Sequence, residues 1–466
     1  MATTRIERDT MGEMTLPAEA FYGASTQRAV ENFPVSGQPL PPAFIHALGL
    51  VKVAAARVNR GLGLLPAETA DAIEAAAQAV ADGAYDAEFP IDVFQTGSGT
   101  STNMNANEVI ATVASRALGR KVHPNDDVNL GQSSNDVIPT VLHVAAAMQI
   151  ERHLLPALRH LQETLTAKAV EFDEVVKIGR THLMDAVPIR LGQEFSGYAR
   201  QVELAGARVE AALPGLRELA IGGTAVGTGL NTHAEFGARM ARALSAMAGT
   251  EFTETVNHFE AQGAQDAYVF AAGALTSVAA SLMKIANDVR LLGSGPQAGL
   301  GELLLPAIQP GSSIMPGKVN PVIAEAVIQV GAQVTGNGTA VVIGGQWGQL
   351  DLNTMLPMMA RNLLESIRLL ANVSRLFADK CLAGTTANVE RAEGYVEGSI
   401  SMATALNPHI GYDRAAQIAK KSYASGRTVR EIAYEDSGLS REQVDEALHP
   451  HRQTVAGTGA GHAAGD

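Results

Sequence analysis

The sequence from residue 311 to residue 320 is Gly311-Ser-Ser-Ile-Met-Pro-Gly-Lys-Val-Asn320, and a second proline follows it. Glycine adopts backbone angles that other residues avoid, and proline cannot continue a regular helix. The stretch therefore predicts a mobile loop that carries two hydroxyl groups and ends in a cation, Lys318, and an amide, Asn320. It resembles a phosphate-binding P-loop, but five residues separate its glycines where that motif has four. A P-loop is therefore excluded.

The bulk composition limits the possible partners. At 466 residues the chain is too long for one core, so two or three structural regions are expected. The net charge of −13 argues against nucleic-acid binding and against an anionic membrane surface, because it repels phosphates. The sole cysteine, Cys381, excludes an intrachain disulfide, a Cys-rich zinc site and a four-cysteine iron–sulfur cluster. Since residues 1–10 lack the apolar core of a signal peptide, a cytoplasmic protein is expected.

Five long segments in the middle of the chain predict helices. They are residues 141–170, 191–213, 264–292, 322–342 and 354–382. In the last of them, apolar residues such as Leu363, Ile367 and Leu370 follow the spacing of a helix. No run of short β-branched strands alternates with these segments, so the sequence predicts an all-α fold around an elongated helical bundle. Residues 1 to about 40 are expected to be irregular, and a further helix is expected after Pro139.

Two stretches carry no charge at all, residues 267–283 and 326–350. Such helices could cross a membrane, but lipid would penalise the polar Gln329, Gln333 and Asn337. A helix that is uncharged all round is typical of the interior of a large protein. We therefore expect no membrane span, and expect bundles from several subunits to pack together.

Polar turns recur along the chain. They are Thr96–Asn103, His123–Asp126, Ser133–Asp136, Gly179–His182 and Gly311–Asn320. Any one of them is most simply a helix cap. Helix N-termini also present free N–H groups and the positive end of a dipole, which bind anions. Several such turns together with Lys318 predict a ligand with two carboxylates, and no metal site, because no second histidine or acidic cluster accompanies His123.

These turns contain motifs that resemble the fumarase/aspartase superfamily. Besides Gly311–Pro321, the similarity covers Thr96–Thr100, Lys121–Asn129, Gln132–Asp136, Ile178–His182, Gly222–Asn231 and Lys284–Asp288. Within the superfamily the chain is most similar to the class II fumarases, the kind that needs no iron. The single cysteine agrees, because the iron–sulfur class needs several.

The resemblance implies a three-domain, all-α fold whose central helices form a twenty-helix core in a homotetramer. The expected domains are residues 1–133, a central five-helix bundle at 134–388, and a small helical domain at 389–466. The composition after about residue 456 predicts a disordered tail. The implied activity is the reversible hydration of fumarate to (S)-malate, a step of the tricarboxylic acid cycle. It would use no cofactor, and three subunits would form each active site.

The resemblance also implies the roles of individual residues. Ser312 is expected to remove the carbon proton, and His182, paired with Glu325, to protonate the departing hydroxyl. Removing a proton beside a carboxylate develops an aci-carboxylate, which Lys318 and Asn320 are expected to stabilise. The other expected substrate contacts are Ser98, Thr100, Ser133, Ser134, Asn135, Thr181 and Ser313. A second dicarboxylate site is implied at His123, Asn125 and Asp126.

Some positions depart from the pattern of the class. Met184 stands where many fumarases have Gln, and residues 346–353 differ from the common ending of that segment. The nearest rival is aspartate ammonia-lyase, whose motifs usually carry Gln after the threonine and Ala before the lysine. This chain has His182 and Gly317 there. A non-catalytic structural tetramer of the same fold is the other alternative, and the filled catalytic positions argue against it.

Overall fold

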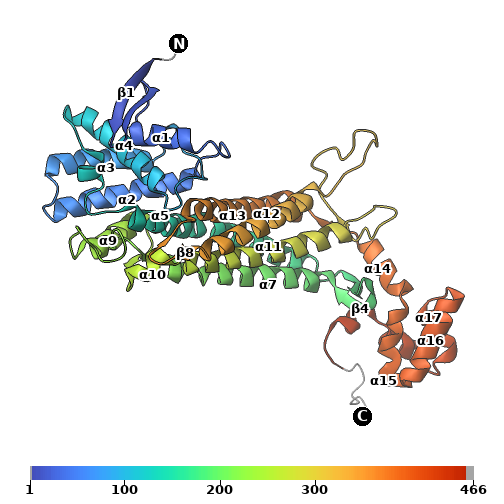
Figure 1. Cartoon of the computed structure of the whole chain (residues 1–466). Coiled ribbons are helices and arrows are strands. Elements are labelled where there is room, and N and C mark those ends of the chain that lie inside the picture. Colours follow the sequence, from blue (N-terminus) through green and yellow to red (C-terminus); the bar gives the residue numbers. More distant parts are fainter. Residues whose placement is uncertain (1–2, 458–466) are drawn as a thin grey trace. The chain divides into compact units, whose positions relative to one another are not determined.

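The computed structural model describes residues 3–457 (Figure 1). The predicted tail lies, from residue 458 onward, outside the described residues. The chain forms two compact units, each built from separate segments. Unit 1 comprises the chain up to Pro156 with Ala205–Ala280 and Val330–Asn372; unit 2 comprises Ala157–Leu204, Ser281–Gln329 and the chain from Val373 onward. The division into domains at 1–133, 134–388 and 389–466 stays a prediction.

The all-α prediction is confirmed, with long helices at all five expected segments. The first consists of α5 (Ser134–Gln149), a π-helical turn (Ile150–Leu154) and α6 (Leu155–Glu171). The others are α7 (Leu191–Glu210), α11 (Asp266–Leu292), α12 (Val322–Gly345) and α13 (Leu356–Phe377). The π-helical turn has a local cause: Pro156 has no N–H, and its ring crowds the carbonyl four residues earlier, so the regular ladder is interrupted there.

In unit 1, α2 (Pro42–Gly61) is the most deeply buried of the early helices, and it packs on α3 (Ala67–Ala81), α5 and α9 (Phe236–Ala248). A Cβ at Gly49 would lie 2.5 Å from the Ala81 nitrogen, so glycine lets α2 and α3 approach closely. The remaining helices of this unit are α1 (Ala24–Asn32), α4 (Thr100–Leu118), α8 (Leu213–Leu216) and α10 (His258–Gly263).

The expectation of an irregular N-terminus is wrong. Strands β1 (Thr4–Asp9) and β2 (Gly12–Pro17) form an antiparallel hairpin, and α1 follows. The Arg5 side chain fixes the hairpin by donating to the backbone oxygens of Pro17, Ala18, Ala20 and Tyr22. Two other short pairings belong to unit 1: β5 (Glu218–Leu219) with β6 (Thr253–Glu254), and β8 (Gly348–Gln349) with β9 (Leu352–Asn353).

Unit 2 contains the hairpin of β3 (Val176–Thr181) and β4 (Met184–Arg190), and the pair β7 (Leu303–Leu304) with β10 (Thr386–Ala387). Its last helices are α14 (Val389–Gly398), α15 (Asn407–Ile410), α16 (Tyr412–Ser425), α17 (Val429–Asp436) and α18 (Arg441–Ala447). Ser440 begins α18 with a capping box that it forms with Gln443.

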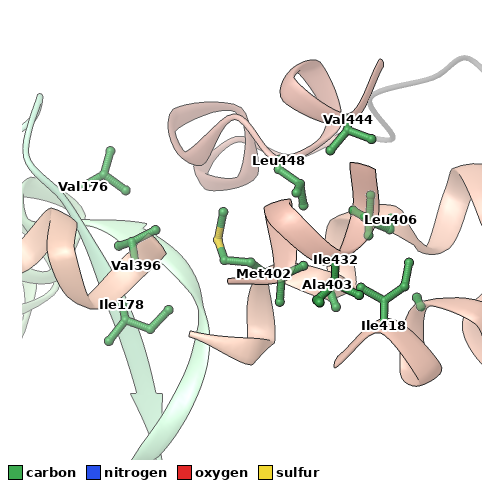
Figure 2. Packing of buried hydrophobic residues seen from close by; sticks show 13 residues of the cluster. Val176, Ile178, Val396, Met402, Ala403, Leu406, Ile418, Ile432, Val444 and Leu448 are labelled. Carbon is green, nitrogen blue, oxygen red and sulfur yellow. The ribbon is translucent and has the colours of Figure 1, made fainter. Parts of the chain in front are cut away.

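A buried apolar cluster joins the β3–β4 hairpin to these last helices (Figure 2). Val176 and Ile178 of β3 lie beside Val396 of α14 (Figure 2). The cluster continues through Met402, Ala403, Leu406, Ile418, Ile432, Val444 and Leu448 (Figure 2). Each fully buried large aliphatic side chain stabilises such a cluster by about 1.5–3 kcal/mol. The cluster therefore holds the β3–β4 hairpin against the last helices of unit 2.

Two helices, α11 and α12, are long and apolar enough to cross a membrane by length and composition alone. In one copy of the chain, 50% of the most apolar window of α11 and 33% of that of α12 are buried. Large apolar side chains of α12 therefore stay accessible, among them Val342 at 40% and Ile343 at 47%.

Candidate active site

The loop that carries Ser312 is closed at its base by two hydrogen bonds. The Gly311 N–H donates to the Lys318 oxygen at 2.8 Å, and the Asn320 amide donates to the Gly311 oxygen at 2.7 Å. A Cβ at Gly311 would lie 2.7 Å from that Lys318 oxygen, so only glycine permits the closure. The loop thus has a fixed base, and its tip is a run of exposed residues from Ser313 to Val319.

The Ser312 hydroxyl oxygen accepts hydrogen bonds from two backbone N–H groups. The N–H groups of Ile314 and Met315 donate to it at 3.2 and 3.0 Å. Donors aimed at one oxygen favour a negative charge on that oxygen. Within residues 3–457, Lys318 is exposed and forms no ion pair with any carboxylate of its own chain. The loop therefore offers a stabilised hydroxyl oxygen and an uncompensated cation.

His182 occupies the tip of the β3–β4 hairpin rather than an irregular turn. Thr181 pairs with Met184, so His182 and Leu183 form a two-residue connection with φ values of 57° and 61°. A turn with positive φ at both central positions matches the twist of the strands and normally uses Asn-Gly. A side-chain-bearing residue in that region costs about 1–3 kcal/mol. The sequence lacks the usual hairpin signal, which is why this hairpin was not predicted.

The hairpin is held on both strands. Arg180 forms a bidentate pair with the fully buried Glu302, with N–O distances of 2.8 and 3.1 Å. On the other strand, Asp185 accepts a hydrogen bond from the Ser399 hydroxyl at 2.9 Å. The anchored strands project His182 and Thr181 into an exposed position.

Glu325 lies in the first turn of α12, as the sequence predicts. Within one described chain, residues 3–457, no ion pair joins Glu325 to His182. Their pairing therefore stays a prediction, and it requires another copy of the chain or a rearrangement.

In unit 1, the N-termini of α4 and α5 carry the predicted hydroxyl groups. The hydroxyls of Ser98 and Thr100 lie 2.8 Å apart at the start of α4. Ser133 caps α5 in a capping box, and the Asn103 amide of α4 donates to the Ser134 hydroxyl at 2.9 Å. The structure thus brings both predicted turns together, with two helix N-termini that suit an anion.

Helix α5 begins at Ser134, five positions before the expected start at Pro139. The buried Asp136 explains the earlier start, because it accepts backbone N–H groups from Ser133, Gly222 and Thr224. Burial raises the pKa of this carboxyl, and these donors act in the opposite direction. Asn135, beside it, donates to the Ala225 oxygen at 2.8 Å.

His123 caps a short π-helical turn, Pro124–Val128. Its Nδ1 accepts the N–H groups of Asn125 and Asp126 at 3.3 and 3.0 Å. The same Nδ1 lies 3.2 Å from the Asp126 carboxylate, but an accepting nitrogen carries no proton, so we assign the contact to the cap rather than to an ion pair. A cavity of about 380 Å³ adjoins this turn, and its charged lining residues are Arg8, Arg116, Lys121, Glu7 and Glu108, besides His123 itself.

The sequence did not indicate the buried contacts that hold the Thr96–Asn103 and Ser133–Asp136 turns of unit 1 in place. Lys52 of α2 and Asn103 of α4 are 0% and 1% exposed, and both contact Asn129. The available signal was a single lysine inside the otherwise apolar run from Leu48 to Ala56. At the departures from the class pattern, Met184 is 70% exposed and Leu350, in the β8–β9 turn, is 94% exposed.

Comparisons with known proteins agree over almost the whole chain. Residues 12–336 match the family described as Lyase, and residues 402–454 match the family described as Fumarase C C-terminus. The chain is 58% identical to a class II fumarate hydratase of Mycobacterium tuberculosis, over 96% of this chain and 95% of the relative. A second class II fumarate hydratase, from Pseudomonas aeruginosa, is 53% identical over 98% and 100%. The crystal structure of class II fumarase from Schistosoma mansoni superposes with a TM-score of 0.94 at 40% identity, covering 97% of this chain and 99% of that one.

Proposed function

The chain belongs to the class II fumarate hydratase family and is a lyase that hydrates fumarate, and we propose that it adds water reversibly and anti, giving (S)-malate. The observation that carries the proposal is the loop at Ser312, where two N–H donors face one hydroxyl oxygen. The ammonium of Lys318 in the same loop has no hydrogen-bonded or charged partner within residues 3–457. Proton abstraction beside a carboxylate needs an oxygen base and a cation of this kind.

In the direction of dehydration, the alkoxide of Ser312 takes the proton from the carbon next to one carboxylate of malate. The electron pair moves into that carboxylate, which becomes an aci-carboxylate with two negative charges. Lys318 and the amide of Asn320 stabilise those charges. The N–H groups of Ile314 and Met315 stabilise the negative charge of the alkoxide, because they already donate hydrogen bonds to the Ser312 oxygen.

His182 donates the proton with which the hydroxyl group leaves as water, directly or through a bound water. Glu325 of another copy orients the imidazole and fixes its tautomer. The anchored hairpin supports this assignment, because Arg180 and Asp185 hold both strands beside the exposed tip.

The two carboxylates of the substrate bind hydroxyl and amide groups at helix N-termini. Those of unit 1 are Ser98, Thr100, Ser133, Ser134 and Asn135; Thr181 and Ser313 of unit 2 complete the set. Since the Ser134 oxygen accepts a hydrogen bond from Asn103, its own proton is free to be donated to a carboxylate. A second dicarboxylate site lies at His123, Asn125 and Asp126, beside a cavity whose lining includes Arg8, Arg116 and Lys121 as well as Glu7 and Glu108.

The active protein is a homotetramer in the cytoplasm, with each site formed by three copies. The accessible apolar faces support the assembly, with Val256 at 97% and Leu350 at 94% exposure in a single copy. The uncharged length of α12 supports it too. Mass photometry tests this part: a stable monomer at micromolar concentration contradicts it.

One assay separates the reaction from its rivals. The absorbance of the fumarate double bond is followed with malate and then with aspartate as the substrate. We expect turnover of malate only. Turnover of aspartate alone identifies an ammonia-lyase, and no turnover of either identifies a non-catalytic tetramer.

A further inference from the structure

Lys52 is a buried cation for which the reaction has no direct use. It lies in the middle of α2 and is 0% exposed. Its ammonium donates to the Asn129 side-chain oxygen and to the Gln132 side-chain oxygen, both at 2.9 Å. Burying a charge lowers stability unless the charge is paired and hydrogen-bonded, and both acceptors of Lys52 are neutral amide oxygens.

The two acceptors of Lys52 lie directly behind the substrate-binding turns. Gln132 immediately precedes Ser133, and its own amide donates to the backbone oxygens of Val128 and Leu130 at 3.1 and 3.2 Å. The Asn129 amide in turn donates to the Gln132 backbone oxygen at 3.1 Å. Lys52 therefore fixes the segment that leads into the cap of α5.

The same contacts reach the other turn. The Asn103 amide donates to the oxygen of Asn129 at 3.2 Å and to the hydroxyl of Ser134 at 2.9 Å. Asn103 lies one turn after Thr100, near the start of α4. A single path, from Lys52 through Asn129 and Asn103 to Ser134, thus connects α2 with both helix N-termini.

We propose that Lys52 is a positioning residue, which holds the Thr96–Asn103 and Ser133–Asp136 turns in one arrangement that accepts a dicarboxylate. The proposal rests on the function proposed above. Its physical basis is that ordered donors bind an anion without first being ordered by it. Below about pH 7, where Lys52 carries its proton, the buried charge adds to this, because a cation behind the turns favours the nearby negative ligand. Burial lowers the pKa of Lys52, and the nearby carboxylate of Asp136 raises it, which favours the charged form of the lysine.

The experiment compares the full-length wild-type chain with Lys52→Met, which fills similar space without the ammonium. The measurements are KM and kcat for malate and fumarate, and the Kd of succinate by calorimetry. Succinate has both carboxylates and no double bond. We expect KM and Kd to rise at least about tenfold, as for one lost charge-assisted hydrogen bond. We expect kcat to stay near the wild-type value, because the turns bind ground state and transition state alike.

Lys168→Met is the matched control. Lys168 is also buried, and its ammonium donates to Glu171 and to the Thr385 oxygen, outside the substrate-binding turns. Its loss is expected to lower thermal stability and to leave Kd unchanged. Wild-type KM and Kd in Lys52→Met, or an equal rise in Lys168→Met, overturns the proposal.

Asn129→Leu provides a second route if Lys52→Met does not fold, because it leaves the lysine in place and removes one of its two acceptors, the one that also contacts Asn103. We expect the same rise in Kd, and no further rise in the double variant, because both changes act through one path. An additive double variant or an unchanged Kd contradicts the proposal. If the wild type binds succinate without turning over malate, the proposed function fails and Kd alone decides the role of Lys52. Absence of succinate binding by the wild type overturns both.

Discussion

The groups expected to react and the groups expected to bind are built in opposite ways. In unit 2, Lys318 and His182 are exposed, and within residues 3–457 neither has a hydrogen-bonded or charged partner on its side chain. In unit 1, the hydroxyl groups of Ser98 and Ser134 are hydrogen-bonded to Thr100 and Asn103 respectively. The difference suits two tasks. The exposed tip of the Ser312 loop must be able to move when it closes over a substrate, although the base of the loop and the hairpin of His182 are held in place. A carboxylate site gains from rigidity. Substitutions of the reacting groups should therefore lower kcat, and substitutions behind the binding groups should raise KM and Kd.

The largest effect is expected for Ser312→Ala. Removing the base should lower kcat by about 10³-fold, within the range of 10²–10⁴ for general acid–base catalysis, with little change in the Kd of succinate. Steady-state kinetics and calorimetry measure both quantities. Ser313→Ala is the matched control, because this neighbouring hydroxyl is exposed, and we expect it to change KM rather than kcat. Near-normal kcat in Ser312→Ala removes the assignment of the base.

A somewhat smaller loss is expected for His182→Asn, about 10²-fold in kcat. Asparagine tolerates the left-handed conformation at this position better than most residues, so the hairpin should persist. The thermal unfolding temperature should accordingly stay unchanged or rise, and calorimetric scanning checks it. Loss of activity together with lower stability would indicate a purely structural histidine.

Most of the fold could be predicted from the sequence, because its signals are local. The five long helices follow from apolar spacing and the scarcity of breaks, and the caps at Thr428 and Ser440 follow from their capping boxes. The β3–β4 hairpin could not be predicted, because His182 and Leu183 hold a turn that normally needs Asn-Gly. Tertiary contacts of β3 with the buried cluster hold it instead.

The candidate site shows the same limit. The motifs point to Ser312 and Lys318 because both residues belong to one continuous stretch of ten residues. The support of the binding turns could not be predicted, since Lys52, Asn103 and Asn129 are far apart in sequence and meet only through helix packing. Sequence therefore indicates candidate reacting groups, but it does not indicate the buried contacts that hold the binding groups.

A moderate effect is expected for Gly311→Ala, which tests whether the base of the loop must be closed. The added Cβ would lie 2.7 Å from the Lys318 oxygen, so the closing hydrogen bonds must lengthen. Misplacing Ser312 and Lys318 by a fraction of an ångström should lower kcat roughly tenfold. Gly317→Ala is a useful comparison, because a Cβ there meets no atom within 4 Å, although its φ of +80° strains the backbone. Equal activity in the wild type and Gly311→Ala would show that the loop adapts freely.

The last effect concerns the rigid region and appears as pH-dependent stability rather than as a change in activity. Burial lowers the pKa of Lys52 from 10.5 to about 7, so the unfolded chain binds more protons at this residue between those pH values. Stability rises with pH wherever the unfolded state binds more protons. This lysine therefore costs the fold least near pH 10 and most below pH 7. Urea denaturation at pH 7, 8 and 9 should show a free energy of unfolding that gains more with pH in the wild type than in Lys52→Met, by up to about 1.4 kcal/mol per pH unit. Parallel pH profiles in the two proteins would mean that the ammonium is not buried in solution. Lys52 would then not hold the binding turns, and the contrast between the two regions would lose its main support.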